Sequence, residues 1–269
     1  MSKFSVVMSV YISDSPIYFI EAINSLLNQT KMPDEIIIIA DGPIGNELNV
    51  ALNYFKNMDL IRIIRLEKNC GLALSRKKAI SSTSFDIIAV MDSDDICVPD
   101  RFEKQIKLLQ DGKTQVVGGW IEEFVNEPRD KGKVRKTPIN HKEIFSFGKW
   151  RNPINHVTLM FTKEAYDSVD GYSSVRHSED WDMISRMLVT GVIIQSVPEV
   201  LVHVRAGDEM IERRRNIEQF KGEMMLFIKM YSIGYINLFH LFGNIMIRVV
   251  LRALPMFVTK FTYNSLLRK

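Results

Sequence analysis

The feature that most restricts the fold is an alternation, over the first 110 residues, of short apolar runs with segments of helical periodicity. The apolar runs are Phe4–Tyr11, Glu35–Ala40, Ile61–Leu66 and Asp86–Met91. Apolar residues recur at helical spacing in segments 16–29, 72–81 and 99–110. This alternation is typical of a parallel β-sheet with crossover helices. The isoleucines at 36–39 also indicate a strand covered on both faces.

The first helical segment is marked at its start by Ser15 and Pro16, which suit an N-cap and a first-turn position. We expect its apolar stripe to face the sheet. That stripe consists of Ile17, Ile20, Ile23, Leu26 and Leu27.

The rest of the chain changes character near residue 205. Residues 111–205 are less regular, with strand-like runs at 115–119, 158–162 and 193–197, and they contain no internal repeat. We expect them to continue the same fold. Residues 206–269 are mainly helical in pattern, apolar and basic. The chain is therefore expected to be an α/β protein with a helical C-terminal segment.

Composition excludes several classes of protein. Of 269 residues, 46% are hydrophobic, which suits a packed globular core, and the net charge of +3 does not indicate a nucleic-acid binder. The two cysteines form no CxxC pair, so a secreted disulfide scaffold is excluded. No small-residue cleavage site follows the apolar run after Lys3, so we expect a buried first strand rather than a signal peptide.

Polar residues follow the predicted strands at the points where each one ends. These residues are Tyr11, Asp41, Asn69 and the cluster from Asp92 to Asp95. In an open parallel sheet the carboxyl ends of the strands lie along one edge, and ligands bind in the crevice there. The sequence therefore predicts the ligand site at this edge.

Three carboxylates fall within four residues, at Asp92, Asp94 and Asp95, directly after an apolar run. Like charges at this spacing repel one another and favour a bound divalent cation, and hard oxygen ligands suit Mg²⁺ or Mn²⁺. A cation held in this way would neutralise a diphosphate. The alternative is a solvated acidic turn before the helix that starts near Pro99.

A second acidic motif, Glu179-Asp180, follows Ser178 at the predicted start of a helix. The helix dipole stabilises carboxylate charge at this position, and a carboxylate held ionised at the rim of a pocket suits a general base. Acids are also common at helix N-termini for the dipole effect alone, so by itself the motif is weak.

Several motifs in order resemble those of the inverting family 2 glycosyltransferases of GT-A fold, and within them the bacterial enzymes that assemble O-antigen or capsular polysaccharide. The motifs are Ser9-Val10-Tyr11, Ala40-Asp41-Gly42, Asn69-Cys70-Gly71-Leu72 with Arg76, Asp92-Ser93-Asp94-Asp95 with Pro99 and Arg101, and Glu179-Asp180 with Arg186. The resemblance covers about residues 4–205. It implies a Rossmann-like, mostly parallel sheet flanked by helices.

The resemblance also implies a division of function within the part of the chain that it covers. Residues 1–110 would bind the nucleotide-sugar, a UDP-sugar, and residues 111–205 would bind the acceptor and carry the base. Residues 206–269 form an amphipathic basic tail by their own pattern. If that tail contacts the membrane, the acceptor would be a saccharide on a lipid diphosphate of the undecaprenyl type.

The donor-site roles implied by the resemblance begin at the ends of the first two strands. There Val10, Tyr11 and Asp41 would hold the nucleobase, with Asp41 accepting from the uracil N3–H. The remaining donor-binding residues would be Asn69, Gly71, Arg76 close to the base and Asp92 at the ribose. Asp94 would ligate Mn²⁺ or Mg²⁺, with Asp92 and Asp95 as further candidate ligands.

In the acceptor half, the resemblance makes Asp180 the candidate base, with Glu179 as the alternative. The base would deprotonate an acceptor hydroxyl as it attacks the anomeric carbon, which inverts that carbon. Four other residues are candidate contacts for the diphosphate or the acceptor: His156, Trp181, His203 and Arg205. The alternative is that their side chains are structural. Arg213–Arg215 are a candidate phosphate clamp or a solvated face.

The tail has a narrow polar stripe of His240, Asn244, Arg248 and Arg252, with apolar residues around the rest of the helix. This pattern is suited to the membrane interface, where anionic lipid adds roughly 1 kcal/mol for each nearby basic residue. Residues 221–269 hold seven Lys or Arg and one acid, Glu223. We expect peripheral attachment to the cytoplasmic face of the inner membrane; packing on the domain or dimerisation is the alternative.

Three other functions compete with this interpretation. A nucleotidyltransferase generally has a Gly-rich basic loop after the first strand, whereas residues 12–16 here contain neither Gly nor a basic residue. A receiver domain would be complete in about 120 residues and would leave Glu179-Asp180 unexplained. A non-catalytic membrane scaffold remains open if the acids are structural.

Overall fold

The computed structural model describes residues 2–130, 132–173, 175, 177–206 and 216–254. Its strands are β1 (Phe4–Val10), β2 (Glu35–Ala40), β3 (Ile61–Arg65), β4 (Ile87–Val90), β5 (Ile96–Cys97), β6 (Val116–Phe124), β7 (Lys133–Arg135), β8 (Met160–Thr162) and β9 (Ile194–Arg205). Its helices are α1 (Pro16–Leu27), α2 (Asn46–Phe55), α3 (Leu72–Ser81), α4 (Arg101–Leu109), α5 (His141–Phe147), the 3₁₀ turn η1 (His156–Thr158), α6 (Lys163–Asp167), α7 (Glu179–Val189), α9 (Ile217–Ser232) and α10 (Leu238–Ala253).

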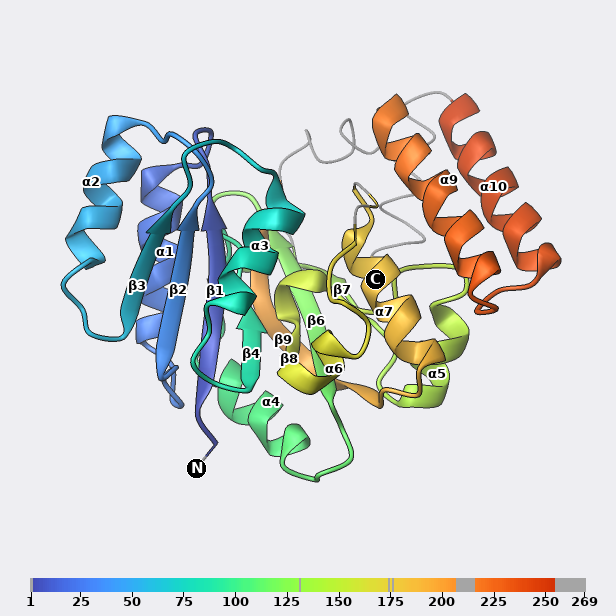
Figure 1. Ribbon diagram of the computed structural model, residues 1–269, viewed down its shortest axis with the longest axis horizontal. Helices are drawn as coiled ribbons and strands as arrows, with labels where there is room; N and C mark the ends of the chain where they lie inside the picture. The colour runs from blue at the N-terminus through green and yellow to red at the C-terminus, as the bar shows by residue number, and fades with distance from the viewer. Residues whose placement is uncertain (1, 131, 174, 176, 207–215, 255–269) are drawn as a thin grey trace.

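One mixed sheet runs through the molecule in the order β3-β2-β1-β4-β8-β6-β9-β5, with β7 paired to β6 (Figure 1). The first four strands of this order are parallel, and β8 is antiparallel to β4. Because β5 pairs with β9, the N-terminal and C-terminal parts of the chain share a single sheet. This confirms that residues 111–205 continue the fold, while the functional boundary at 110 stays a prediction.

Both faces of β1, β2 and β4 are buried, as the isoleucine run predicts for β2, whereas β3 at the edge of the sheet is partly exposed. In β2, Ile36 and Ile38 belong to the core cluster that includes α1 and α2, while Ile37 and Ile39 belong to the cluster on the opposite face with α3. Successive side chains of a strand point to opposite faces, so a strand covered on both sides must be apolar at every position.

The stripe predicted for α1 is rotated in the structure. Ser15 caps the helix and Pro16 occupies its first turn, as expected. The buried face, however, is formed by Phe19, Ala22, Ile23 and Leu26, whereas Ile17 is exposed. Phe19 packs edge-on against Phe55 of α2, with ring centroids 6.0 Å apart, so an aromatic contact decides which face turns inward.

The C-terminal hairpin of α9 and α10 lies beside α7 and α5 (Figure 1), and the turn between its helices contains Gly234 at φ +74°. No described helix is long and apolar enough to cross a bilayer. The polar stripe of α10 packs inward: Asn244 is fully buried and donates to the Lys149 carbonyl at 2.9 Å. Arg252 pairs with Glu223 of α9, also at 2.9 Å.

The inward stripe corrects the expectation that Arg248 and Arg252 would face anionic lipid. The guanidinium of Arg248 lies over the rings of Trp181 and Phe227, and both arginines lie within ion-pair distance of Glu223. Many of the apolar residues of α10 are exposed on its outer face. The exposed ones are Leu238, Phe239, Phe242, Met246, Ile247, Val249 and Val250.

We predict that Gly42→Ala lowers the free energy of unfolding by about 2–5 kcal/mol. Gly42 has φ +85°, where a Cβ costs about 1–2 kcal/mol, and an added Cβ would lie 2.5 Å from the Asn69 amide nitrogen, an overlap that adds about 1–3 kcal/mol. Gly112→Ala is the matched control, because Gly112 has φ +72° but open space around it. Urea unfolding should show a larger loss for Gly42→Ala, and equal losses would contradict the close approach.

Candidate active site

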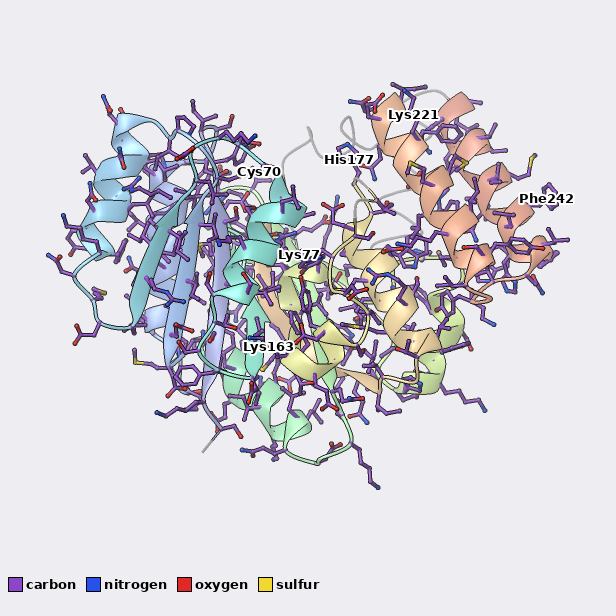
Figure 2. The ribbon with its side chains drawn as sticks, in the orientation of Figure 1. Cys70, Lys77, Lys163, His177, Lys221 and Phe242 are labelled. Atoms are coloured by element: carbon purple, nitrogen blue, oxygen red, sulfur yellow. The ribbon has the colours of Figure 1, made fainter. Side chains whose placement is uncertain are left out.

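The carboxyl ends of β1, β2 and β4 meet the N-terminus of α3 at one edge of the sheet. Cys70, just before α3, and His177, just before α7, both lie toward the upper edge of Figure 2. Val10 is buried at the end of β1, and the next residue, Tyr11, is partly exposed. The predicted site edge therefore exists, with Tyr11 accessible to a ligand.

Asp41 joins β2 to the start of α3. Its carboxylate accepts hydrogen bonds from the amides of Cys70, at 2.7 Å, and Gly71, at 3.0 Å, and the Asn69 side chain donates to its backbone carbonyl at 3.2 Å. These bonds satisfy amides at a helix N-terminus, where the dipole favours a negative charge. The structure thus brings together Asp41, Asn69 and Gly71, three of the predicted donor residues.

Arg76 connects α3 to the acidic loop, residues 92–95. Its Nη2 lies 2.5 Å from Asp92 Oδ1, and its side chain is nearly buried. Burial lowers the pKa of Arg76, but the charge of Asp92, the hydrogen bond to Asp92 and the charge of Glu179 raise it, and the net shift is upward. Arg76 therefore stays charged, pairs with Asp92 of the acidic loop and interacts electrostatically with Glu179 of α7. Its predicted place near the nucleobase did not include these interactions.

The acidic loop crowds negative charge into a small volume. Asp94 retains an accessible surface, yet partial burial, with the charges of Asp92 and Asp14, raises its pKa to about 6. Asp14 accepts from the Ser93 hydroxyl at 2.8 Å and from the Tyr11 amide at 3.1 Å, which ties the loop to the end of β1. Because a divalent cation would relieve this repulsion, the charges at Asp92 and Asp94 fit a metal.

Asp95 is turned into the protein, which corrects its assignment as a candidate metal ligand. It is almost completely buried and accepts from the Arg205 amide at 2.9 Å. Burial and the neighbouring acids Asp94 and Asp92 raise its pKa well above the ordinary range. Asp95 therefore fixes the loop to β9 from the inside.

Arg205 holds the acidic loop and does not reach out as a free phosphate clamp. Its Nε donates to the Asp94 carbonyl at 3.2 Å, and its Nη2 pairs with Glu21 at 2.6 Å. The guanidinium also stacks over Tyr18, 3.7 Å from the ring centroid. Its position beside the loop agrees with the predicted neighbourhood, but its hydrogen bonds are structural.

The described part of the chain contains no group of three or more His, Cys, Asp or Glu side chains arranged to hold a metal ion. This pattern differs from an all-protein metal cage. It suits a cation that takes one or two carboxylates and completes its shell with water and phosphate oxygens, as Mg²⁺ and Mn²⁺ do. Asp94 and Asp92 are the residues that fit such a role.

The acidic motif of α7 lies at the helix N-terminus, as predicted. The Ser178 side chain makes no capping bond there, although Ser178 occupies the N-cap position. Asp180 Oδ2 accepts from the Asn152 side chain at 2.6 Å. Partial burial raises the pKa of Glu179 and the Asp180 charge adds to it, while Arg76 opposes the change.

Two residues absent from the sequence prediction lie in this site, Asn152 and Tyr172. Tyr172 is buried, with its hydroxyl 2.7 Å from Nε2 of His156. Burial, followed by the charge of Arg76, lowers the pKa of His156 well below its usual range, so the ring is neutral. The Asn152-Pro-Ile-Asn-His156 segment was visible in the sequence, but nothing there indicated which residues its two ends would contact.

The structure assigns Trp181 to the hydrophobic core, which corrects its assignment as a candidate acceptor contact. Its Nε1 donates to the Gly148 carbonyl at 2.9 Å, and its ring packs edge-on against Phe227 of α9. His203 is likewise directed within the sheet, with Nδ1 2.9 Å from Glu122 Oε2. Burial lowers the pKa of His203, and Glu122 acts against this change. Arg213–Arg215 lie outside the described residues.

Sequence comparison decides the family. Residues 5–169 match the model described as Glycosyl transferase family 2, which spans more than half of the chain. The chain belongs to this family. The match includes the β1, β2 and β4 ends and the acidic loop, but it stops before α7.

Full-length relatives extend the likeness across the C-terminal part. An uncharacterized glycosyltransferase of Haemophilus influenzae is 33% identical, with 99% of this chain and all of the relative covered. The Escherichia coli UDP-Gal:alpha-D-GlcNAc-diphosphoundecaprenol beta-1,3-galactosyltransferase is 32% identical, covering 99% of this chain and 97% of the relative. The amylovoran biosynthesis glycosyltransferase AmsE of Erwinia amylovora is 31% identical, covering 97% and 98%.

Solved structures confirm the GT-A fold at low sequence identity. Staphylococcus aureus TarS in complex with UDP has a TM-score of 0.66 at 14% identity, covering 97% of this chain and 75% of that one. The Pyrobaculum calidifontis mannosyltransferase PcManGT, solved with GDP-Man and Mn²⁺, has a TM-score of 0.65 at 15% identity, covering 96% and 78%. The glycosyltransferase therefore has the α/β fold that its motifs predict.

We predict that Asp94→Asn stabilises the metal-free enzyme at pH 7.5. A folded-state pKa of about 6 exceeds the ordinary 3.8, so Asp94 stabilises the fold below about pH 4 and this contribution is lost as pH rises through 6. Thermal unfolding in a chelator should show a smaller decline in Tm from pH 5 to 7.5 for the variant. Asp59→Asn, which removes an exposed carboxylate, is the charge control. A lower Tm for Asp94→Asn at pH 7.5 would refute the repulsion.

Proposed function

We propose that this family 2 glycosyltransferase moves a sugar from a UDP-sugar to a saccharide on a lipid diphosphate, with inversion at the anomeric carbon. The observation that carries the proposal is that two acidic groups share Arg76 as a cationic neighbour: Asp92 of the acidic loop forms an ion pair with it at 2.5 Å, and Glu179 of α7 interacts with it electrostatically. A candidate diphosphate-metal site and a candidate base therefore lie in one charged neighbourhood. A displacement reaction needs both groups near the reacting carbon, because the nucleophile and the leaving group act on that carbon in one step.

On the donor side, Asp41 and Tyr11 contact the nucleobase, with Val10, Asn69 and Gly71 shaping the pocket. The hydrogen bonds that the Cys70 and Gly71 amides donate to the Asp41 carboxylate support this role, because they fix the direction of its remaining lone pairs. Asp92 faces the ribose. The Arg76 ion pair holds Asp92 in place and limits its movement.

Asp94 and Asp92 hold Mn²⁺ or Mg²⁺ in this proposal. The raised pKa of Asp94 supports the assignment, since a cation would stabilise the ionised form that protein alone disfavours. The bound ion supplies Lewis acidity, which stabilises charge on the departing diphosphate. Arg205 and Asp95 keep the loop carrying Asp94 against β9.

Asp180 is the proposed base. It takes the proton of an acceptor hydroxyl while that oxygen forms a bond to the anomeric carbon, and the bond from that carbon to the UDP oxygen breaks with its electron pair on UDP. The hydrogen bond from Asn152 supports Asp180 over Glu179, because it orients one carboxylate oxygen and leaves the other free. Glu179 is then an acceptor-binding residue. If a Glu179→Gln variant loses turnover and Asp180→Asn does not, Glu179 is the base instead.

The acceptor class is inferred from the Escherichia coli and Erwinia amylovora relatives, whose names specify a diphosphoundecaprenol acceptor and amylovoran biosynthesis. Both relatives are matched over nearly their whole length. We therefore propose a place in bacterial surface polysaccharide assembly, of the O-antigen or capsule type. The UDP moiety is also supported by the name of the Escherichia coli relative.

The two acidic sites should separate by mutation. Asp94→Ala should abolish turnover and weaken UDP binding in the presence of Mn²⁺, because it removes a metal ligand. Asp180→Asn keeps shape and should abolish turnover while UDP affinity changes less than about threefold, since it lies on the acceptor side. Isothermal calorimetry with UDP and a radiolabelled UDP-sugar transfer assay measure the two effects.

The same experiment tests the alternative functions. Equal losses of UDP affinity in both variants would refute the separate roles. A parent protein that binds lipid vesicles but neither UDP nor UDP-sugars, with and without Mn²⁺, would favour the non-catalytic scaffold. A preference for nucleoside triphosphates would favour a nucleotidyltransferase.

We also propose that the hairpin of α9 and α10 attaches the enzyme peripherally to the cytoplasmic face of the inner membrane. The support is the orientation of α10: its polar residues contact the protein, and many of its apolar residues are exposed. A wide apolar face on a surface helix favours burial among lipid headgroups and acyl chains. An enzyme whose acceptor is lipid-linked would be held at its substrate in this way.

Phe239→Ser combined with Phe242→Ser should reduce binding to vesicles of mixed zwitterionic and anionic phospholipid by about tenfold or more. The two side chains are 73% and 64% exposed, and burying each in lipid is worth about 1.5–3 kcal/mol. Cosedimentation measures this loss. The matched control is Val50→Ser with Tyr54→Ser on α2, at 70% and 75% exposure, which should keep parental binding.

Salt provides a second readout for the membrane proposal. Because Arg248 and Arg252 face Glu223, the attachment should depend only weakly on ionic strength. A steep loss of binding in salt would show that other basic residues dominate. If the parent protein does not bind vesicles but self-associates through Phe239 and Phe242, the apolar face of α10 is a contact with a second copy of the chain and not with the membrane.

A further inference from the structure

The segment from Asn152 to His156 contacts α7 at one end and Tyr172, in the turn before α7, at the other. Asn152 donates to Asp180 at 2.6 Å, and His156 Nε2 lies 2.7 Å from the Tyr172 hydroxyl. Its middle is fixed as well, because Asn155 donates to the Gly119 carbonyl of β6 at 2.8 Å. The segment is therefore attached to the sheet and reaches α7 and the turn that precedes it.

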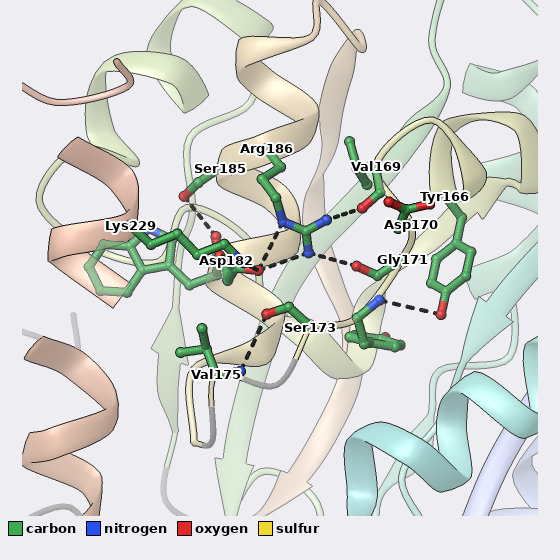
Figure 3. Close-up of polar contacts among 12 residues, drawn as sticks. Tyr166, Val169, Asp170, Gly171, Ser173, Val175, Asp182, Ser185, Arg186 and Lys229 are labelled. Carbon is green, nitrogen blue, oxygen red and sulfur yellow. Dashed lines mark hydrogen bonds and ion pairs between the residues drawn. The ribbon is translucent and has the colours of Figure 1, made fainter. Parts of the chain in front are cut away.

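The turn that carries Tyr172 is fastened to α7 from the other side. Arg186 donates to the carbonyls of Val169 and Gly171, the latter at 2.6 Å, and pairs with Asp182 at 2.8 Å (Figure 3). Asp182, which is nearly fully buried, is also paired with Lys229 of α9 at 2.9 Å. Any shift of Tyr172 relative to the sheet would thus be transmitted to α7.

The hydrogen bond between His156 and Tyr172 bridges two uncharged groups in a charged surrounding. Burial keeps His156 neutral, and burial likewise raises the pKa of Tyr172, so its hydroxyl keeps the proton. Arg76 acts electrostatically on both side chains, and Tyr172 also experiences the charges of Asp180 and Asp92. The pair therefore lies within the electrostatic influence of Arg76, the residue that also pairs with Asp92 of the acidic loop.

We propose that His156 and Tyr172 act as a positioning pair, which sets the distance between the donor half of the site and the carboxylates of α7. The inference rests on the proposed sugar transfer and adds two residues that act through Asp180. The donor residues Asp41, Asp92 and Asp94 have their own supports in α3, Arg76 and β9. Loss of the pair therefore changes the rate of transfer and leaves nucleotide binding in place.

The test is a double-mutant cycle of Tyr172→Phe and His156→Leu, measured by kcat, KM for the acceptor, and UDP affinity in Mn²⁺. Tyr172→Phe keeps the ring and its packing on Tyr166, whose centroid is 5.8 Å away. Each single variant should lower kcat about tenfold or more, because small misplacements of reacting groups are costly. The double variant should be no slower than the slower single variant, since both remove one hydrogen bond.

His156→Gln offers a rescue, because its amide retains a donor and an acceptor for the Tyr172 hydroxyl. It should recover most of the kcat lost in His156→Leu. Tyr166→Phe is the matched control: its hydroxyl accepts from the Tyr172 amide at 3.4 Å in the same aromatic cluster, and its loss should change kcat less than about twofold. Each variant should bind UDP within about twofold of the parent and unfold at a similar Tm, which shows that it is folded.

The outcomes separate this inference from the proposed function. A parent that binds UDP and transfers sugar, with unchanged kcat in Tyr172→Phe and His156→Leu, would overturn the positioning pair alone. Additive losses, or a parallel loss of UDP affinity, would also overturn it. A parent without any transfer would remove the proposed function and this inference with it.

Discussion

The architecture of this enzyme depends on holding several carboxylates together against their mutual repulsion. Asp92, Asp94 and Asp95 fall within four consecutive positions, and burial makes the charges of Asp94 and Asp95 still more costly. Two arginines counter this repulsion from different directions. Arg76 reaches Asp92 from α3, and Arg205 fixes the loop from the end of β9. Since these arginines come from segments far apart in the chain, the acidic loop links the two parts of the sheet.

The C-terminal hairpin also pairs its charged side chains inside the protein. Its arginines pair with Glu223 inside the hairpin. Arg248 also lies over the ring of Trp181, and Asn244 donates to the Lys149 carbonyl, so polar groups of α10 attach the hairpin to the catalytic domain. The buried carboxylate of Asp182 is another such attachment, because α7 and α9 both supply cations to it. The outer face of α10 is left apolar. The hairpin that carries this face is attached through α9 to α7, the helix whose first turn contains the candidate base Asp180.

Much of the site was predictable because strand ends and charge clusters are local properties of a sequence. The bounds of β2 and α3 agree with the predicted runs, and Asp41, Asn69, Gly71 and the acidic loop lie at the expected edge. Helix α2 was not predicted, although Leu48, Ala51, Leu52 and Phe55 recur at helical spacing and form its buried face. Tyr172 was missed because an isolated tyrosine in a turn carries no signal until its neighbours are known.

The sequence by itself determined the family, the strand positions and the residues that supply negative charge, because apolar periodicity and motif spacing are properties of the order of residues and do not depend on long-range contacts. Only the tertiary structure decided which partners those residues have. Asp95 and Trp181 turned inward although they stand beside exposed motif residues, and the polar stripe of α10 turned toward the protein. Periodicity fixes which residues share a helix face, but long-range contacts such as Asn244 with Lys149 decide what that face meets.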